Sequence, residues 1–192
     1  MKNDIVCDVQ HTCKKSPPAY LIHNAPFKSP KTKFSNQQES IPFLGEGYYF
    51  WEENPDAAHS WGKRHYSNVY SIVEYSDLTL EGNSLLDLLD RKYSKYFREL
   101  ISQFEKKNPR FKTFLLGQWI EMFKNLHLKD GKTFPYLYIR ADEHFPDSRD
   151  NQSLRQMIRL SKKGYHTYLE PLIIICIIEK KDIVCKNRNV IY

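Results

Sequence analysis

Stretches of alternating and of uninterrupted hydrophobic residues predict the strands of this chain. Residues 69–75 (VYSIVEY) alternate between apolar and polar side chains, which is typical of a strand with one face in the core. Residues 172–178 are apolar throughout and rich in β-branched side chains, which predicts a strand buried on both faces. Two further runs, 19–23 (AYLIH) and 47–51 (GYYFW), are bounded by turn residues and predict short strands. Weaker strand candidates are residues 135–140, 183–185 and 190–192.

Helical spacing of apolar residues predicts four helices. In the first, over 54–64, Asn54 is a good N-cap and the proline after it suits the first helical position. Two longer helices are predicted over 84–126, the first opening on a capping box at Ser84 and the second opening at Asn108. A fourth is predicted over 151–163, where two lysines and then a glycine are typical of a helix C-terminus.

The order of these elements favours an α+β fold. Strands and helices are partly segregated along the chain, whereas a parallel sheet would require regular alternation. Residues 1–18 are interpreted as a polar lead-in, and residues 28–40, with three lysines and no apolar period, as a basic loop. The chain has 192 residues and no internal repeat, so it is expected to form one domain.

Composition and charge narrow the classes of function. The net charge of +6 favours anionic partners such as nucleic acid or nucleotides, although a solvated basic surface would account for it equally well. The first 18 residues are polar, and the longest apolar run is too short to cross a bilayer, so a cytoplasmic protein without a membrane partner is expected. The cysteines and histidines lack the spacing of a metal site, so no metal is expected.

Residues 45–51 (GEGYYFW) carry the strongest chemical signal. Gly45 and Gly47 tolerate positive φ and let a ligand or a second backbone approach closely. The aromatic residues after them, including Tyr48 and Tyr49, offer flat faces that can stack on a planar heterocycle, although an aromatic strand is also a common core element. The motif therefore indicates a ligand site only if other parts of the chain supply polar groups to it.

Three motifs together resemble the ADP-ribosyltransferase superfamily, in the His-Tyr-Glu branch that includes the poly-ADP-ribose polymerase catalytic domains. The branch has an apolar strand ending in His-Gly, then Gly-x-Gly-apolar-Tyr-Phe before a helix of small residues, then a Glu before a hydrophobic strand. The matching features here are His23 after Leu-Ile, the motif at 45–50 with two alanines behind it, and Glu170 before the run at 172–178. Asn24 stands where the family has its glycine.

The resemblance implies one domain over residues 1–192, with a split β-sheet core and residues 84–126 as a helical insertion. It implies NAD+ as the co-substrate. His23 would hydrogen-bond the nicotinamide ribose, and Asn24 would grip the carboxamide through its backbone. Tyr49, or Tyr48 as the second choice, would stack on the nicotinamide ring. Glu170 would bind the ribose 2′-hydroxyl and stabilise the oxocarbenium-like centre that forms as nicotinamide leaves.

The resemblance also implies a macromolecular acceptor for the ADP-ribose. The basic charge favours RNA or DNA, with protein as the second choice. Arg64, His65 and the lysines at 28–33 are candidates for binding the pyrophosphate. A small catalytic domain of this kind is similar to bacterial toxins and phage-defence effectors, which implies a neutralising antitoxin as a further partner.

Three other functions remain open at this point. A basic RNA-binding protein or RNase toxin would use cationic and stacking side chains without NAD+ chemistry. An inactive NAD+ or ADP-ribose sensor on the same fold is suggested by Asn24 in place of the glycine. RNA 2′-phosphotransferase chemistry belongs to a related branch that does not use the Glu.

Overall fold

The computed structural model of the chain describes residues 2–33, 39–143, 157–159, 166–168 and 171–192. Its helices are α1 (Pro18–Asn24), α2 (Pro55–His65), α3 (Arg91–Lys107) and α4 (Leu116–Asp130), with 3-10 turns at Gly82–Ser84, Pro109–Thr113 and Lys180–Asp182. Its strands are β1 (Ile5–Lys14), β2 (Thr32–Lys33), β3 (Glu39–Ser40), β4 (Tyr48–Glu52), β5 (Tyr70–Leu80), β6 (Leu85–Asp87), β7 (Tyr138–Asp142), β8 (Met157–Arg159), β9 (His166–Tyr168), β10 (Ile173–Ile177) and β11 (Asn187–Val190). The fold is α+β, as the order of elements predicted.

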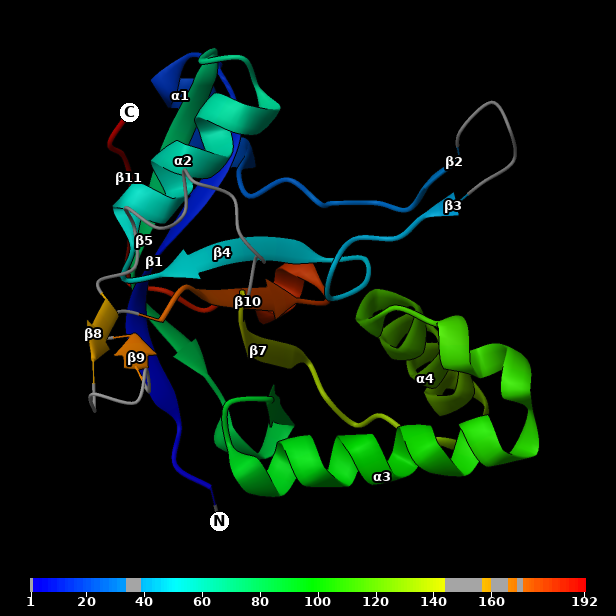
Figure 1. Cartoon of the computed structure of the whole chain (residues 1–192). Coiled ribbons are helices and arrows are strands. Elements are labelled where there is room, and N and C mark those ends of the chain that lie inside the picture. The colour runs from blue at the N-terminus through cyan, green and yellow to red at the C-terminus, as the bar shows by residue number, and fades with distance from the viewer. Residues whose placement is uncertain (1, 34–38, 144–156, 160–165, 169–170) are drawn as a thin grey trace.

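A seven-stranded sheet forms the centre of the molecule, in the order β11-β5-β1-β4-β10-β7-β6 (Figure 1). Neighbouring strands are antiparallel except for the parallel pair β6 and β7. β1 pairs with β5 along its whole length, but it pairs with β4 only at Val9–Glu52 and Gln10–Trp51. The two strands therefore part beyond Gln10, and the sheet opens between them.

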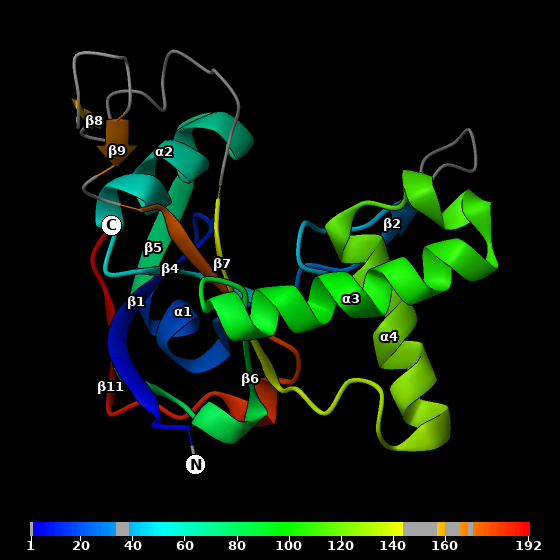
Figure 2. The same ribbon diagram turned by 60° about the horizontal axis from the view of Figure 1, so that its bottom comes forward.

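Helices cover both faces of the sheet because the strands are apolar on both sides. Ile72 and Val73 of β5 point to opposite faces, as successive residues of a strand must. Ile72 belongs to the same buried cluster as Ala58 of α2, and Val73 belongs to the cluster that contains Leu21 of α1. The pair α3 and α4 lies on the α2 side and extends away from the sheet, as Figure 2 shows. None of the helices in the described ranges is long and apolar enough to cross a membrane.

Four of the predicted elements are confirmed, three with shifts of one residue at their ends and β5 with a C-terminal end five residues later than predicted. They are α2, β4, β5 and β10. In α2 the Asn54 side chain accepts a hydrogen bond from the Ala57 N–H at 2.9 Å, and Pro55 occupies the first helical position. Local signals were sufficient here because the cap, the proline and the apolar spacing all favour the same helix.

Two predictions for the N-terminal part of the chain are wrong. Residues 5–14, interpreted as part of a polar lead-in, form the central strand β1, and residues 19–23, predicted as a strand, lie in the helix α1. The helix starts at Pro18 and ends at Asn24, whose side-chain amide donates to the Tyr20 carbonyl oxygen one turn back. Only Leu21 of this helix is buried, so its apolar run does not line the core as a strand would.

The middle of the chain begins with a strand and not with a helix. The stretch that was expected to open a helix at Ser84 contains β6, and α3 begins after its N-cap Asp90. Asn108 caps a short 3-10 turn, and α4 begins at Leu116. Of the predicted helix at 151–163, the structure describes only Met157–Arg159, which is the strand β8, and the rest lies outside the described residues.

Candidate functional site

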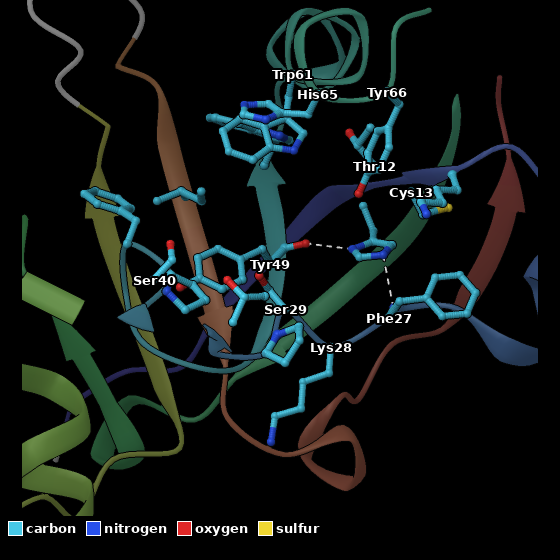
Figure 3. A pocket seen from close by; sticks show the side chains of 18 of the residues that line it. Thr12, Cys13, Phe27, Lys28, Ser29, Ser40, Tyr49, Trp61, His65 and Tyr66 are labelled. Carbon is cyan, nitrogen blue, oxygen red and sulfur yellow. Dashed lines mark hydrogen bonds between the residues drawn. The ribbon is translucent and has the colours of Figure 1, made fainter. Parts of the chain in front are cut away.

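A cavity of about 910 Å³ opens where β1 and β4 part (Figure 3). Its walls come from β1, β4, β10 and α2, from Tyr20 of α1, and from the segments at 27–32 and 40–43. The volume lies in the upper part of the roughly 300–1,000 Å³ range of small-molecule sites. The unfilled space thus results from the early end of the β1–β4 pairing, and it is large enough for a dinucleotide.

The glycine turn places Tyr49 in the wall of this cavity. Gly45 has φ +80°, a conformation that side-chain-bearing residues rarely adopt. The Tyr49 hydroxyl donates to the Gly45 carbonyl oxygen at 2.6 Å and accepts from the Leu44 N–H at 2.8 Å. Burial raises the pKa of Tyr49 above its ordinary value, so the phenol stays protonated and keeps its role as donor.

The second glycine lets β4 approach β10. A Cβ on Gly47 would overlap the Cys176 sulfur and lie 2.7 Å from the Ile177 carbonyl oxygen, both on β10. Tyr48, the second choice for stacking, packs in the core on the α1 side and does not line the cavity. The motif therefore brings Gly45, Gly47 and Tyr49 together, with Tyr49 as the ring that faces the open space.

His11 lies at the point where β1 and β4 part. Its Nδ1 lies 2.9 Å from the Tyr49 carbonyl oxygen, and its Nε2 accepts the Phe27 N–H at 3.1 Å. This pattern requires a neutral ring with the proton on Nδ1. Burial lowers the pKa of His11 to about 4, the Tyr49 carbonyl opposes that shift, and Lys180 adds to it. At neutral pH the ring is therefore an uncharged connection between three segments of the chain.

Aromatic and cationic side chains complete the cavity from two sides. Figure 3 shows Trp61, His65 and Tyr66 reaching in from α2 and its C-terminal end, with Lys28 on the opposite side. The Trp61 and His65 rings lie 3.7 Å apart between centroids. Lys14, at the end of β1, also lines the space. These groups suit a ligand that combines planar rings with negative charge.

Glu143 is the one acidic residue among the described residues that line the cavity. It directly follows β7, it is only 5% exposed, and its N–H donates to the Leu172 carbonyl oxygen at 2.7 Å. Glu143 is not among the site residues that the sequence motifs indicated. The available signal was an acidic residue three positions after the predicted strand at 135–140, where polar residues often serve a site.

The structure does not bring His23 and Asn24 to the cavity. Both are exposed residues at the end of α1 and neither lines the space around Tyr49. The Asn24 backbone oxygen accepts from the Lys180 Nζ at 2.6 Å. Glu170 lies outside the described residues, although Ile174 of the strand that follows it lines the cavity. Arg64 lies on α2 with its guanidinium 6.0 Å from the centre of the Trp61 ring.

Sequence reasoning missed His11 because the strand that carries it was not predicted. A histidine followed by a hydroxyl residue, Thr12, in an extended segment was the signal that could have found it. Comparison of the chain with protein families, with curated proteins and with solved structures finds no match. Within the described ranges, no group of three or more His, Cys, Asp or Glu residues could hold a metal ion.

Proposed function

We propose that this protein binds NAD+ in the cavity between β1 and β4 and transfers ADP-ribose to a macromolecular acceptor. The observation that carries the proposal is the position of Tyr49. The glycine turn that resembles the second motif of ADP-ribosyltransferases holds this ring at a dinucleotide-sized cavity in the parting of two central strands. We interpret that parting as the split of the sheet that the resemblance implies.

Different residues around the cavity contact different parts of the dinucleotide. Tyr49 stacks on the nicotinamide ring, and the aromatic surface of Trp61 and Tyr66 receives the adenine. Lys14 and Lys28 face the pyrophosphate, where charge-assisted hydrogen bonds are strongest. His11, in place of His23, is the histidine of the site, and it acts by fixing Tyr49 and the segment at Phe27.

The reaction breaks the bond between the nicotinamide nitrogen and the ribose carbon, and nicotinamide leaves with the bonding electrons as a neutral molecule. An oxygen or nitrogen atom of the acceptor then forms the new bond to that carbon and loses its proton. Positive charge develops on the ribose between the two events. A carboxylate held in a water-poor site stabilises that charge far more than one in water.

Two glutamates are candidates for that carboxylate. The resemblance assigns the role to Glu170, which precedes β10. Glu143 is buried in the cavity wall at the adjacent end of β7, beside the first residues of the β10 segment. The inactive-sensor alternative rested on Asn24, which lies away from the cavity, so no feature of the site favours it over the enzyme.

The test is incubation with NAD+ labelled in the adenosine, with separate pools of RNA, DNA and protein. We expect release of nicotinamide and transfer of label to one pool. Glu170→Gln and Glu143→Gln are compared with the wild type, and the variant that loses the catalytic carboxylate should be slower by a factor on the order of 10²–10³. Glu99→Gln, on the exposed side of α3, is the matched control. Absence of nicotinamide release with all three pools would overturn the proposal.

A further inference from the structure

The first half of α3 presents a row of cations on one exposed side. Arg91, Lys95 and Arg98 are exposed and follow one another at the i, i+4 and i+7 positions, with Ser94 among them. Together these four residues line a surface hollow of about 410 Å³. Lys92, three residues before Lys95, is exposed beside the row. The first eight residues of α3 thus include four cations and no acid. We call the surface of Arg91, Ser94, Lys95 and Arg98 the basic face of α3.

The cations of the basic face are available to a partner. In the part of the chain that the structure describes, the guanidinium groups of Arg91 and Arg98 have no hydrogen bond or ion pair. Lys95 lies 3.9 Å from Glu99, but these side chains are 65% and 59% exposed. Such a pair contributes little to stability and is readily exchanged for another anion. The fold does not use these charges, and they repel one another until an anion neutralises them.

The spacing of the row suits a chain of phosphates. Four helical residues rise about 6 Å and three rise about 4.5 Å, so the three cations recur about every 4.5–6 Å along the helix. One nucleic-acid strand carries a charge about every 3.4 Å along a duplex axis, so it can place a phosphate against each cation.

A membrane surface fits this helix less well. Peripheral membrane helices insert an apolar face between lipids. The apolar side of α3 is already used inside the protein, where Phe97 is buried and lies 5.5 Å from the Phe123 ring of α4. Figure 2 shows α4 beside α3. The buried and partly buried apolar residues of α3 pack in the core cluster, and the exposed residues of its first half are mostly cations.

We infer that the basic face of α3 is a docking surface for the phosphate backbone of a nucleic acid. Docking itself requires no NAD+ chemistry. The further statement that the docked nucleic acid is the ADP-ribose acceptor rests on the proposed function. The α3–α4 pair would then recognise the acceptor, while the cavity between β1 and β4 binds the dinucleotide.

The test uses the full chain with Arg91, Lys95 and Arg98 all changed to Gln, which keeps the aliphatic stem and the helix propensity. The control changes the exposed Lys106, Lys112 and Lys129 to Gln, which removes the same charge from other surfaces. Binding of a fluorescein-labelled 20-nucleotide RNA, and of the DNA of the same sequence, is measured by anisotropy from 50 to 200 mM salt. Circular dichroism checks that both variants are folded.

We expect Kd to rise at least tenfold in the basic-face variant and by less than threefold in the control. The slope of log K against log salt should fall by about 2 in magnitude, because each lost phosphate contact removes roughly 0.7 from the slope for single strands. Equal affinity of the two variants overturns the inference, and so does wild-type binding to phosphatidylserine vesicles or to polyaspartate without binding to RNA or DNA. Nicotinamide release is assayed in parallel, so failure of docking and failure of NAD+ chemistry are distinguished.

Discussion

His11 connects three parts of the chain through one uncharged ring. It belongs to β1, it donates to the carbonyl of Tyr49 on β4, and it accepts the N–H of Phe27 after α1. Protonation would turn Nε2 into a donor that faces another donor, and it would place a charge on a ring that is only 5% exposed. The side chain thus makes the shape of the cavity wall depend on pH.

The first prediction concerns the stability of this histidine site. The pKa of His11 is about 4 when folded and about 6.5 when unfolded, so between these values the unfolded state binds more protons and stability rises with pH. The stabilisation is fully present above pH 6.5 and is lost as the pH falls to 4, by about 3 kcal/mol in total. The free energy of unfolding by urea is measured for the wild type and for His11→Gln from pH 4 to pH 7. The difference between the two should rise with pH. A flat difference would contradict the neutral buried ring.

Tyr49 allows its hydroxyl and its ring to be tested separately. Tyr49→Phe leaves the Leu44 N–H and the Gly45 carbonyl without their partner and should lower the free energy of unfolding by about 1–3 kcal/mol. The stacking face remains, so nicotinamide release at saturating NAD+ should stay within a few-fold of the wild type. Tyr49→Leu should lower release far more. Equal loss of release in both variants would mean that the ring has no role apart from the turn.

Among the elements, β1 and α1 show where sequence patterns are insufficient. β1 contains Gln10, His11 and Thr12 in succession, so it reads as polar, yet all three are buried in the middle of the sheet. Their partners are distant in sequence: the Thr12 hydroxyl donates to the Ala58 carbonyl, and the Gln10 side chain accepts from the Asn54 N–H. A pattern of residues cannot show such tertiary partners. Conversely, α2 and β4 were predicted because their signals are local.

The helix α4 supports the glycine turn from outside the sheet. Glu121 of α4 is buried and accepts hydrogen bonds from the Glu46 N–H and the Lys124 ammonium, and it lies 3.2 Å from the Lys31 ammonium. Burial by itself would raise the pKa of Glu121, but the bonds from Lys124 and Glu46 lower it overall. Part of the segment 84–126 therefore fixes the geometry of the turn that carries Tyr49.

The contact between Glu121 and the glycine turn can be tested by substitution. Glu121→Gln leaves two lysines without their buried anion and should lower the free energy of unfolding by about 1–3 kcal/mol at pH 7. Because the pKa of Glu121 is lowered on folding, its contribution is present above the unfolded pKa and disappears as the pH falls through the folded value. The exposed Glu99→Gln should cost less than 0.5 kcal/mol. If both variants lost a similar free energy of unfolding, α4 would not stabilise the turn through Glu121.

At the scale of the whole molecule, the site depends on which strands are neighbours. The turn at 45–51 identified Tyr49 and the glycines because their chemistry is local. His11 and Glu143 reach the same cavity from β1 and from the end of β7, which lie on either side of the β4–β10 pair. Strand order is a property of the complete sheet. The sequence therefore pointed to His23, whereas His11 is the histidine that lines the cavity, even though the class of fold was predicted.

A dinucleotide bound in this cavity should stabilise the entire fold, because β1, β4, β10 and α2 all line it. With NAD+ at 100 times its Kd, the gain is about 2.7 kcal/mol, which corresponds to a rise in Tm of roughly 5–10 °C for a domain of this size. The Tm of each variant is measured with and without NAD+, so that the effect of the substitution on the free protein cancels in the difference. Tyr49→Leu and Trp61→Ala should lose most of the rise, whereas His23→Ala should keep it because His23 does not line the cavity. If the rise in Tm were lost in His23→Ala and kept in Tyr49→Leu, the nucleotide would bind outside the cavity between β1 and β4.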